Sequence, residues 1–170
     1  DALAGCGVQF ALVPPNDEVY PPGFATWVEV AGPAEPLEGE HRPGHFRGVA
    51  TIVLKLLNMV RPDVAYFGQK DYQQWLVIRR MVEDLNVPAE VRRCPIVREP
   101  DGLAMSSRNA YLEAGARQRA VVLHRALKRA EQLVAEGERD AAEVARQMRD
   151  VIVTVDDARI DYVALVDPDT

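Results

Sequence analysis

The chain has 170 residues, 48% of them hydrophobic, which is enough for one large domain or for one full domain and part of a second. Its formal net charge is −6, with acidic and basic residues interspersed, which argues against a nucleic-acid-binding protein. No apolar run is long enough to span a membrane, and Cys6 and Cys94 lack metal-binding spacing, so we expect two reduced thiols.

The first part of the chain predicts two strands and then a basic loop. Residues 8–13 form an apolar run, and residues 24–30 alternate apolar side chains, so each segment predicts a strand. The following loop ends at residues 41–48 with two histidines, two arginines and two glycines. Such a cluster before a helix suits an anion or a carboxylate, with Arg42 and His45 as candidate ligands. A solvated loop is the alternative, and the spacing does not favour a metal.

The middle of the chain alternates helix and strand. Apolar residues recur with helical spacing over residues 49–60, and the β-branched and aromatic run 64–67 predicts a buried strand. A second helical pattern covers residues 70–86, and residues 89–97 predict another strand. Strand, helix and strand in this order are typical of a parallel sheet. Residues 1–95 are therefore expected to be the later part of a Rossmann-like domain of the α/β class.

The junction between the strand at 64–67 and the next helix carries the most informative side chains. Gly68 lies where the chain turns, and Lys70, Asp71 and Gln74 follow within about one helical turn. A helix N-terminus after a parallel strand attracts anions, because unpaired N–H groups and the helix dipole converge there. Lys70 could contact a phosphate, Asp71 could accept from hydroxyls, and Gln74 could bind a polar substrate. An ordinary solvated helix N-terminus is the alternative.

A second polar group follows a predicted hairpin at residues 97–104. Pro-Asp-Gly at residues 100–102 predicts a tight turn. Ser106, Ser107 and Arg108 come next, and two hydroxyls beside an arginine suit a phosphate. A helix-capping turn is the alternative, and for the two serines taken alone it is the better explanation.

The last part of the chain predicts two helices and a strand. The helical patterns cover residues 114–136 and 140–151, and residues 160–166 predict the strand. His124 lies within the first helix and is expected to be structural. These elements follow the predicted Rossmann-like domain in the chain.

Several strings together resemble the pantothenate synthetase (pantoate–β-alanine ligase) family. The spacing between them matches that of the family over about residues 5–112. They are Leu37-Glu38-Gly39, Arg42-Pro43, His45-Phe46-Arg47-Gly48-Val49, Pro62-Asp63, Phe67-Gly68-Gln69-Lys70-Asp71-Tyr72-Gln73-Gln74 and Asp101-Gly102-Leu103-Ala104-Met105-Ser106-Ser107-Arg108-Asn109. The resemblance implies a Rossmann-like nucleotidyltransferase fold with a smaller α/β C-terminal lid domain over residues 96–170, which is incomplete in this chain. It also implies a cytoplasmic homodimer, binding neither membrane nor nucleic acid, that makes pantothenate from pantoate, β-alanine and ATP with Mg²⁺ through a pantoyl adenylate.

The resemblance also implies roles for individual residues. The implied sets are, for catalysis, Lys70, Ser106, Ser107 and Arg108; for ATP, Gly68, Gln69, Lys70, Asp71, Val97, Met105, Ser106, Ser107 and Arg108; for pantoate, Gln74; and for support of the substrate site, Arg42 and His45. Within the ATP set, Asp71 would accept from the ribose, while Val97 and Met105 would flank the adenine. No protein metal ligand is implied.

The chain also departs from the family pattern. It lacks the His-x-Gly-His motif of the family's N-terminal half, starts at Asp1 and stops before the family's usual end, so we expect a fragment that is inactive alone. Gln69 stands where the family more often has glutamate. Two alternatives stay open: another nucleotidyltransferase that activates a small acid, and a non-catalytic fragment that dimerises through residues 24–30.

Overall fold

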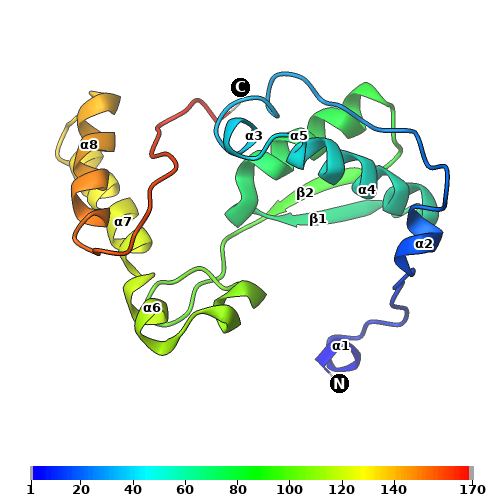
Figure 1. Cartoon of the computed structure of the whole chain (residues 1–170), viewed down its shortest axis with the longest axis horizontal. Helices are drawn as coiled ribbons and strands as arrows, with labels where there is room; N and C mark the ends of the chain where they lie inside the picture. Colours follow the sequence, from blue (N-terminus) through cyan, green and yellow to red (C-terminus); the bar gives the residue numbers. More distant parts are fainter. Residues whose placement is uncertain (1, 169–170) are drawn as a thin grey trace.

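The structure is a computed structural model that describes residues 2–168. Its sheet has two parallel strands, β1 (Val64–Gly68) and β2 (Glu90–Cys94), with Val64 opposite Glu90. Helix α5 (Tyr72–Asp84) connects them, and α4 (His45–Val60) precedes β1. Figure 1 shows α4 and α5 together on one side of the strands. The predicted strand–helix–strand unit, and with it the α/β class, is confirmed.

The first hydrophobic core lies between α4, α5 and the sheet. Phe46, Ala50 and Leu57 of α4 meet Val77, Ile78, Met81 and Val82 of α5, and Ala65, Phe67 and Val91 of the strands pack against them. Val77 and Ile78 are fully buried, which stabilises the fold by about 1.5–3 kcal/mol for each side chain. This core fixes the N-terminal end of α5, where the predicted site lies.

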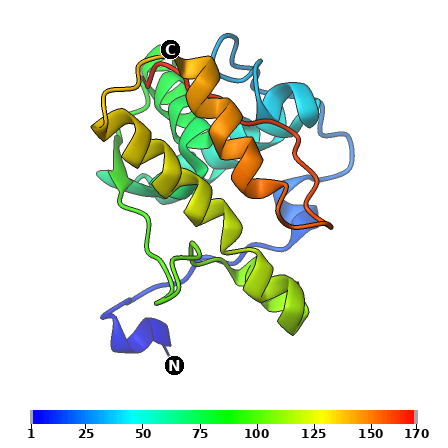
Figure 2. The same cartoon turned by 90° about the vertical axis from the view of Figure 1, so that its left-hand side faces the viewer.

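A second core holds the C-terminal part together. Helices α7 (Val122–Ala135) and α8 (Ala141–Ile152) lie side by side (Figure 2), and Val163 packs against them. Asp140 caps α8 by accepting from the Ala142 N–H at 2.9 Å. The two clusters of buried residues share no member. A boundary between residues 95 and 96 stays a prediction.

The helix predicted over residues 114–136 is two helices, α6 (Ala114–Arg119) and α7. At the join, the Leu123 N–H donates to the carbonyl of Ala120, three residues back. Such a tightened turn changes the helix direction. The prediction of one continuous helix was therefore wrong at this point. Of the apolar face predicted for it, Ala126 and Leu133 are buried, whereas Leu123 and Leu127 are exposed, so that face was only partly right.

Three predicted strands are absent from the described part of the chain: residues 8–13, 24–30 and 160–166. Residues 8–13 have no regular secondary structure and are exposed, and Phe10 keeps 90% of its surface accessible. In the second segment the Val28 N–H donates to Thr51 Oγ1 of α4 at 3.0 Å, so a helix side chain takes the place of a strand partner. An alternating pattern does not make a strand without a neighbouring backbone to pair with.

The remaining short elements are α1 (Ala2–Gly5), α2 (Asn16–Val19) and α3 (Glu38–His41), with 3-10 turns η1 (Gln69–Asp71) and η2 (Ser107–Tyr111). Within residues 2–168, no helix combines the length and the apolar character needed to cross a membrane. Cys6 and Cys94 are both free thiols, as expected.

Candidate functional site

The site begins where β1 runs into α5. Gly68 ends β1 with an ordinary extended backbone, φ −74° and ψ 134°, and no atom lies within 4 Å of the position of an added Cβ. The turn that follows is η1, so α5 starts at Tyr72 and not at Lys70. Lys70 Nζ lies 3.2 Å from Asp71 Oδ1, and both side chains are partly exposed. The pair therefore contributes little to stability, and its charges remain accessible to a ligand.

A cavity of about 580 Å³ opens beside this junction. Six residues singled out from the sequence line it, although they come from three separate segments: Arg42, His45, Lys70, Asp71, Gln74 and Arg108. Three of them are cations of the kind that bind phosphate or carboxylate. The structure thus brings the basic loop, the helix start and the serine–arginine loop to one place.

The other predicted site residues do not line the cavity. They are Gly68, Gln69, Val97, Met105, Ser106 and Ser107. Val97 and Met105 are more than half exposed. Ser106 Oγ accepts from the Arg108 N–H at 3.2 Å, which is the capping turn named above as the alternative. In this conformation, Arg108 alone reaches the cavity from its loop.

The hairpin before that loop is confirmed. Arg98 and Ala104 form an antiparallel bridge, and the N–H groups of Glu99 and Met105 donate to the carbonyls of Leu103 and Val97. Asp101 Oδ1 accepts from the Leu103 N–H at 3.1 Å, and its other oxygen accepts from Arg117 of α6 at 2.7 Å. The Arg117 guanidinium is the main cause that lowers the pKa of Asp101. The loop is therefore attached to a well-bonded turn.

Gln73 is a site residue whose role sequence reasoning missed. Its Nε2 donates to the carbonyls of Pro33 and Pro36 at 3.0 and 2.6 Å, and its Oε1 accepts from the Glu38 N–H at 3.2 Å. One side chain of α5 thus fixes the wall formed by residues 33–38. Its partners are backbone groups, so they leave no mark in the sequence beyond the Gln73-Gln74 pair.

Glu38 is the second missed residue, and its carboxylate forms part of the cavity wall. Its Oε2 lies 3.3 Å from Arg42 Nη1, which is also 3.4 Å from His45 Nε2. Burial, and then the charge of Arg42, lower the pKa of His45. His45 is consequently neutral at pH 7 and can accept from Arg42.

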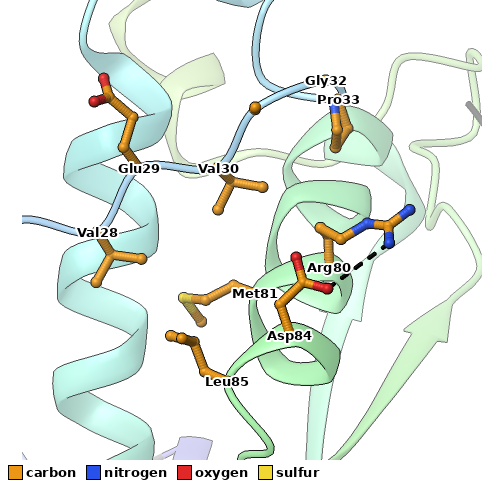
Figure 3. Close-up of a pocket in the computed structure, with 10 residues that line it drawn as sticks. Val28, Glu29, Val30, Gly32, Pro33, Arg80, Met81, Asp84 and Leu85 are labelled. Carbon is orange, nitrogen blue, oxygen red and sulfur yellow. Dashed lines mark ion pairs between the residues drawn. The ribbon is translucent and has the colours of Figure 1, made fainter.

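A different cavity, of about 340 Å³, lies between residues 28–33 and α5 (Figure 3). Val28, Met81 and Leu85 make much of its wall apolar, and its one arginine, Arg80, pairs with Asp84 at 3.8 Å. None of the catalytic or substrate-binding residues predicted from the sequence lines this cavity. The candidate site is therefore the cavity at Lys70.

No group of three or more His, Cys, Asp or Glu side chains that could hold a metal ion occurs within the part of the chain that the structure describes. Two carboxylates line the Lys70 cavity, Glu38 and Asp71. Magnesium is commonly held by one or two carboxylates together with substrate phosphates, so this donor set fits an ion that arrives with a nucleotide.

A parallel βαβ unit with cations gathered at the start of its helix defines an α/β protein of the nucleotidyltransferase-like class. The comparison with known families is more specific: the chain belongs to the pantoate-beta-alanine ligase family, whose model matches residues 1–170.

Relatives agree with this assignment. The pantothenate synthetase of Moorella thermoacetica is 56% identical over 170 residues, which are 100% of this chain and 60% of that protein. The Thermotoga neapolitana pantothenate synthetase is 54% identical over 163 residues, 96% of this chain and 58% of that protein. The chain therefore spans about 60% of the length of these curated relatives.

Solved structures give the same fold. The crystal structure of pantothenate synthetase from Thermus thermophilus matches with a TM-score of 0.95 and 48% identity, covering 99% of this chain and 61% of that one. Pantoate-beta-alanine ligase from Francisella tularensis, complexed with beta-gamma ATP and beta-alanine, matches with a TM-score of 0.73 and 32% identity, over 88% and 56% of the chains.

Proposed function

We propose that the protein containing this chain condenses pantoate with β-alanine, using ATP and forming a pantoyl adenylate. The observation that carries the proposal is the convergence of Arg42, Lys70, Gln74 and Arg108, from three segments, on one cavity. Membership of the family and the ATP analogue named with the Francisella structure support it.

The chemistry needs placed charges more than a nucleophilic side chain. In the first step a pantoate carboxylate oxygen attacks the α-phosphorus of ATP, and pyrophosphate leaves. In the second step the amine of β-alanine attacks the acyl carbon, and AMP leaves with the bridging oxygen. Negative charge grows on phosphate oxygens in the first step, so Lys70 and Arg108 would stabilise it electrostatically.

Orientation falls to the other residues of the site. Gln74 would hold a hydroxyl of pantoate, Asp71 would accept from the ribose, and Arg42 with neutral His45 would support a carboxylate. Such positioning lowers the barrier because it removes the entropy cost of bringing the reactants together.

The serine–arginine loop would have to move to complete the site. Val97 and Met105 would flank the adenine, Gly68 and Gln69 would lie along the nucleotide, and Ser106 and Ser107 would reach the phosphates when the loop closes. Support comes from the exposure of Ser107 and Arg108 at the start of η2, and from Arg108, which already reaches the cavity. Closure would exclude water that hydrolyses the adenylate.

Three further parts of the proposal rest on the family resemblance: magnesium, a homodimer and a cytoplasmic setting. Magnesium would neutralise phosphate charge, and Asp71 and Glu38 are the carboxylates that could contact it. The dimer is tested by measuring the mass of the complete protein in solution, where a monomeric mass at micromolar concentration would contradict it.

A substrate panel tests the proposed function. The complete protein is incubated with ATP and one of several small hydroxy acids, and pyrophosphate release is measured. We expect release that depends on pantoate and coupling to pantothenate only with β-alanine. Equal release with other acids would favour a different nucleotidyltransferase, and the absence of both release and ATP binding would favour a non-catalytic protein.

A further inference from the structure

The C-terminal segment of the described chain returns to the Lys70 cavity. Residues 160–168 run from the α7–α8 pair toward α3, drawn in red in Figure 1. Tyr162 and Val166 line the cavity with the residues of α5 and the 33–38 wall. Tyr72 of α5 donates from its hydroxyl to the carbonyl of Pro168 at 2.9 Å. A segment far along the sequence thus contributes side chains to the site.

Within this segment, Tyr162 contacts Glu38 of the cavity wall. Its hydroxyl donates to Glu38 Oε1 at 3.3 Å, and its ring stacks on His41 with 5.5 Å between the centroids and 23° between the planes. Burial, then the charge of Glu38, raise the pKa of the Tyr162 phenol. The hydroxyl is therefore protonated at pH 7 and remains a donor.

The backbone of Glu38 is held independently of Tyr162. The Glu38 N–H donates to Gln73, and the next residue must be glycine, because a Cβ on Gly39 would lie 1.8 Å from the carbonyl oxygen of Ala34. Because the backbone of Glu38 is already fixed, the orientation of its carboxylate depends on the two side chains that contact it, Tyr162 and Arg42.

The two oxygens of Glu38 have different partners. Tyr162 contacts Oε1 and Arg42 makes one contact to Oε2, both at 3.3 Å, which is longer than a strong charge-assisted bond of roughly 2.5–2.9 Å. A carboxylate turned to face the guanidinium with both oxygens would form the parallel two-bond pair that arginine prefers, and that pair would occupy the donors of Arg42.

We propose that Tyr162 is a positioning residue for the carboxylate substrate: its contact with Oε1 keeps the Glu38 carboxylate turned so that Arg42 meets one oxygen only, which leaves Arg42 donors for the substrate. The inference rests on the proposed function, because it assigns Arg42 to the acid that is activated. Tyr162 acts through Glu38 and Arg42 and need not touch the reacting atoms.

The contact itself is tested without substrate. The complete protein is labelled with ¹³C at the tyrosine ring carbon that bears the hydroxyl, and the tyrosine signals are followed by NMR during a pH titration. Tyr162→Phe identifies the Tyr162 signal. We expect Glu38→Gln to lower the midpoint of that signal, because the neighbouring negative charge is removed. An unchanged midpoint would overturn the contact.

The positioning role is tested by kinetics of the complete protein. Tyr162→Phe should raise KM for pantoate roughly tenfold, the value of about one charge-assisted contact, with little change in kcat. Adding Glu38→Gln should restore much of the loss, since an amide cannot make the two-bond pair. The control is Tyr20→Phe, whose ring packs on Phe24 and Trp27 outside the cavity.

The possible outcomes separate the contact from the positioning role. If Glu38→Gln lowers the midpoint of the Tyr162 signal but Tyr162→Phe leaves KM for pantoate unchanged, the contact is only structural and the positioning role is overturned. A raised KM that Glu38→Gln does not relieve would also contradict it. If the parent protein shows no pantoate-dependent pyrophosphate release, the proposed function fails, while the NMR titration still decides the contact.

Discussion

Replacing Gly102 with alanine tests how the turn before the serine–arginine loop is held. Gly102 has φ +96°, and an added Cβ would lie 2.1 Å from Cδ2 and 2.8 Å from Nε2 of His124 in α7. His124 was expected to be structural, and the structure places its ring against this turn. The left-handed backbone costs an alanine roughly 1–2 kcal/mol, and overpacking against the ring adds roughly 1–3 kcal/mol.

Gly137→Ala is a matched control because it has the backbone strain without the clash. Gly137 has φ +103°, and nothing lies within 4 Å of its added Cβ. The effect of alanine on the unfolded chain is the same in both variants and cancels in the comparison. Gly102→Ala should therefore lower the free energy of unfolding by about 1–3 kcal/mol more than Gly137→Ala does.

Urea unfolding followed by circular dichroism gives both values. Adding His124→Ala to Gly102→Ala should recover part of the extra loss in the free energy of unfolding, because the ring atoms that clash are gone. The recovery is partial, since the packing of the His124 ring is lost as well. Equal losses in Gly102→Ala and Gly137→Ala would refute the reasoning, since they would show that the His124 ring moves away at no cost.

Four other outcomes are expected. Lys70→Ala should slow pyrophosphate release about a hundredfold or more with an unchanged urea midpoint, because one preorganised charge is lost at the phosphate; near-normal release would remove Lys70 from the site. Gln73→Ala should lower the free energy of unfolding by about 2–3 kcal/mol, since three hydrogen bonds to residues 33–38 are lost, and a change below about 0.5 kcal/mol would contradict that role. Arg108→Lys should weaken activity about tenfold or more, because a point charge cannot replace the planar guanidinium. In the parent protein, hydrogen exchange of the serine–arginine loop should slow when a non-hydrolysable ATP analogue binds, and equal exchange with and without the analogue would exclude loop closure. Asp101→Asn should destabilise the protein at pH 7: the folded carboxyl has a lowered pKa, so its stabilisation is present above the unfolded pKa and is lost as pH falls through the folded pKa. The difference in the free energy of unfolding between Asp101→Asn and the parent, measured by urea unfolding, should shrink as the pH is lowered. A difference that does not depend on pH would contradict the ion pair.

The local parts of the fold could be predicted from the sequence. Helix α4 and helix α5 follow from the spacing of their apolar residues, and Asp140 marks the start of α8, because these signals act within a few residues. Strands depend on partners elsewhere in the chain. The alternation at residues 24–30 thus predicted a strand, whereas the segment bonds to Thr51 instead.

The candidate site was predictable only where chemistry marks the side chain. Lys70 and Arg108 stand in strings whose charges indicate a ligand. Gln73 stands in the same string as Lys70, but its role depends on backbone carbonyls that no side chain marks. Tyr162 stands in no such string and meets Glu38 across 124 positions of sequence. Contacts of that kind follow from the fold and not from a motif.

Transfer of an oxygen isotope tests the central claim most directly. The complete protein is given pantoate with ¹⁸O in its carboxylate, together with ATP and β-alanine, and the products are analysed by mass spectrometry. An adenylate formed in the Lys70 cavity predicts one ¹⁸O in AMP for each pantothenate made, and none in pyrophosphate. Label in inorganic phosphate with ADP as the product, or AMP without label, would contradict the account.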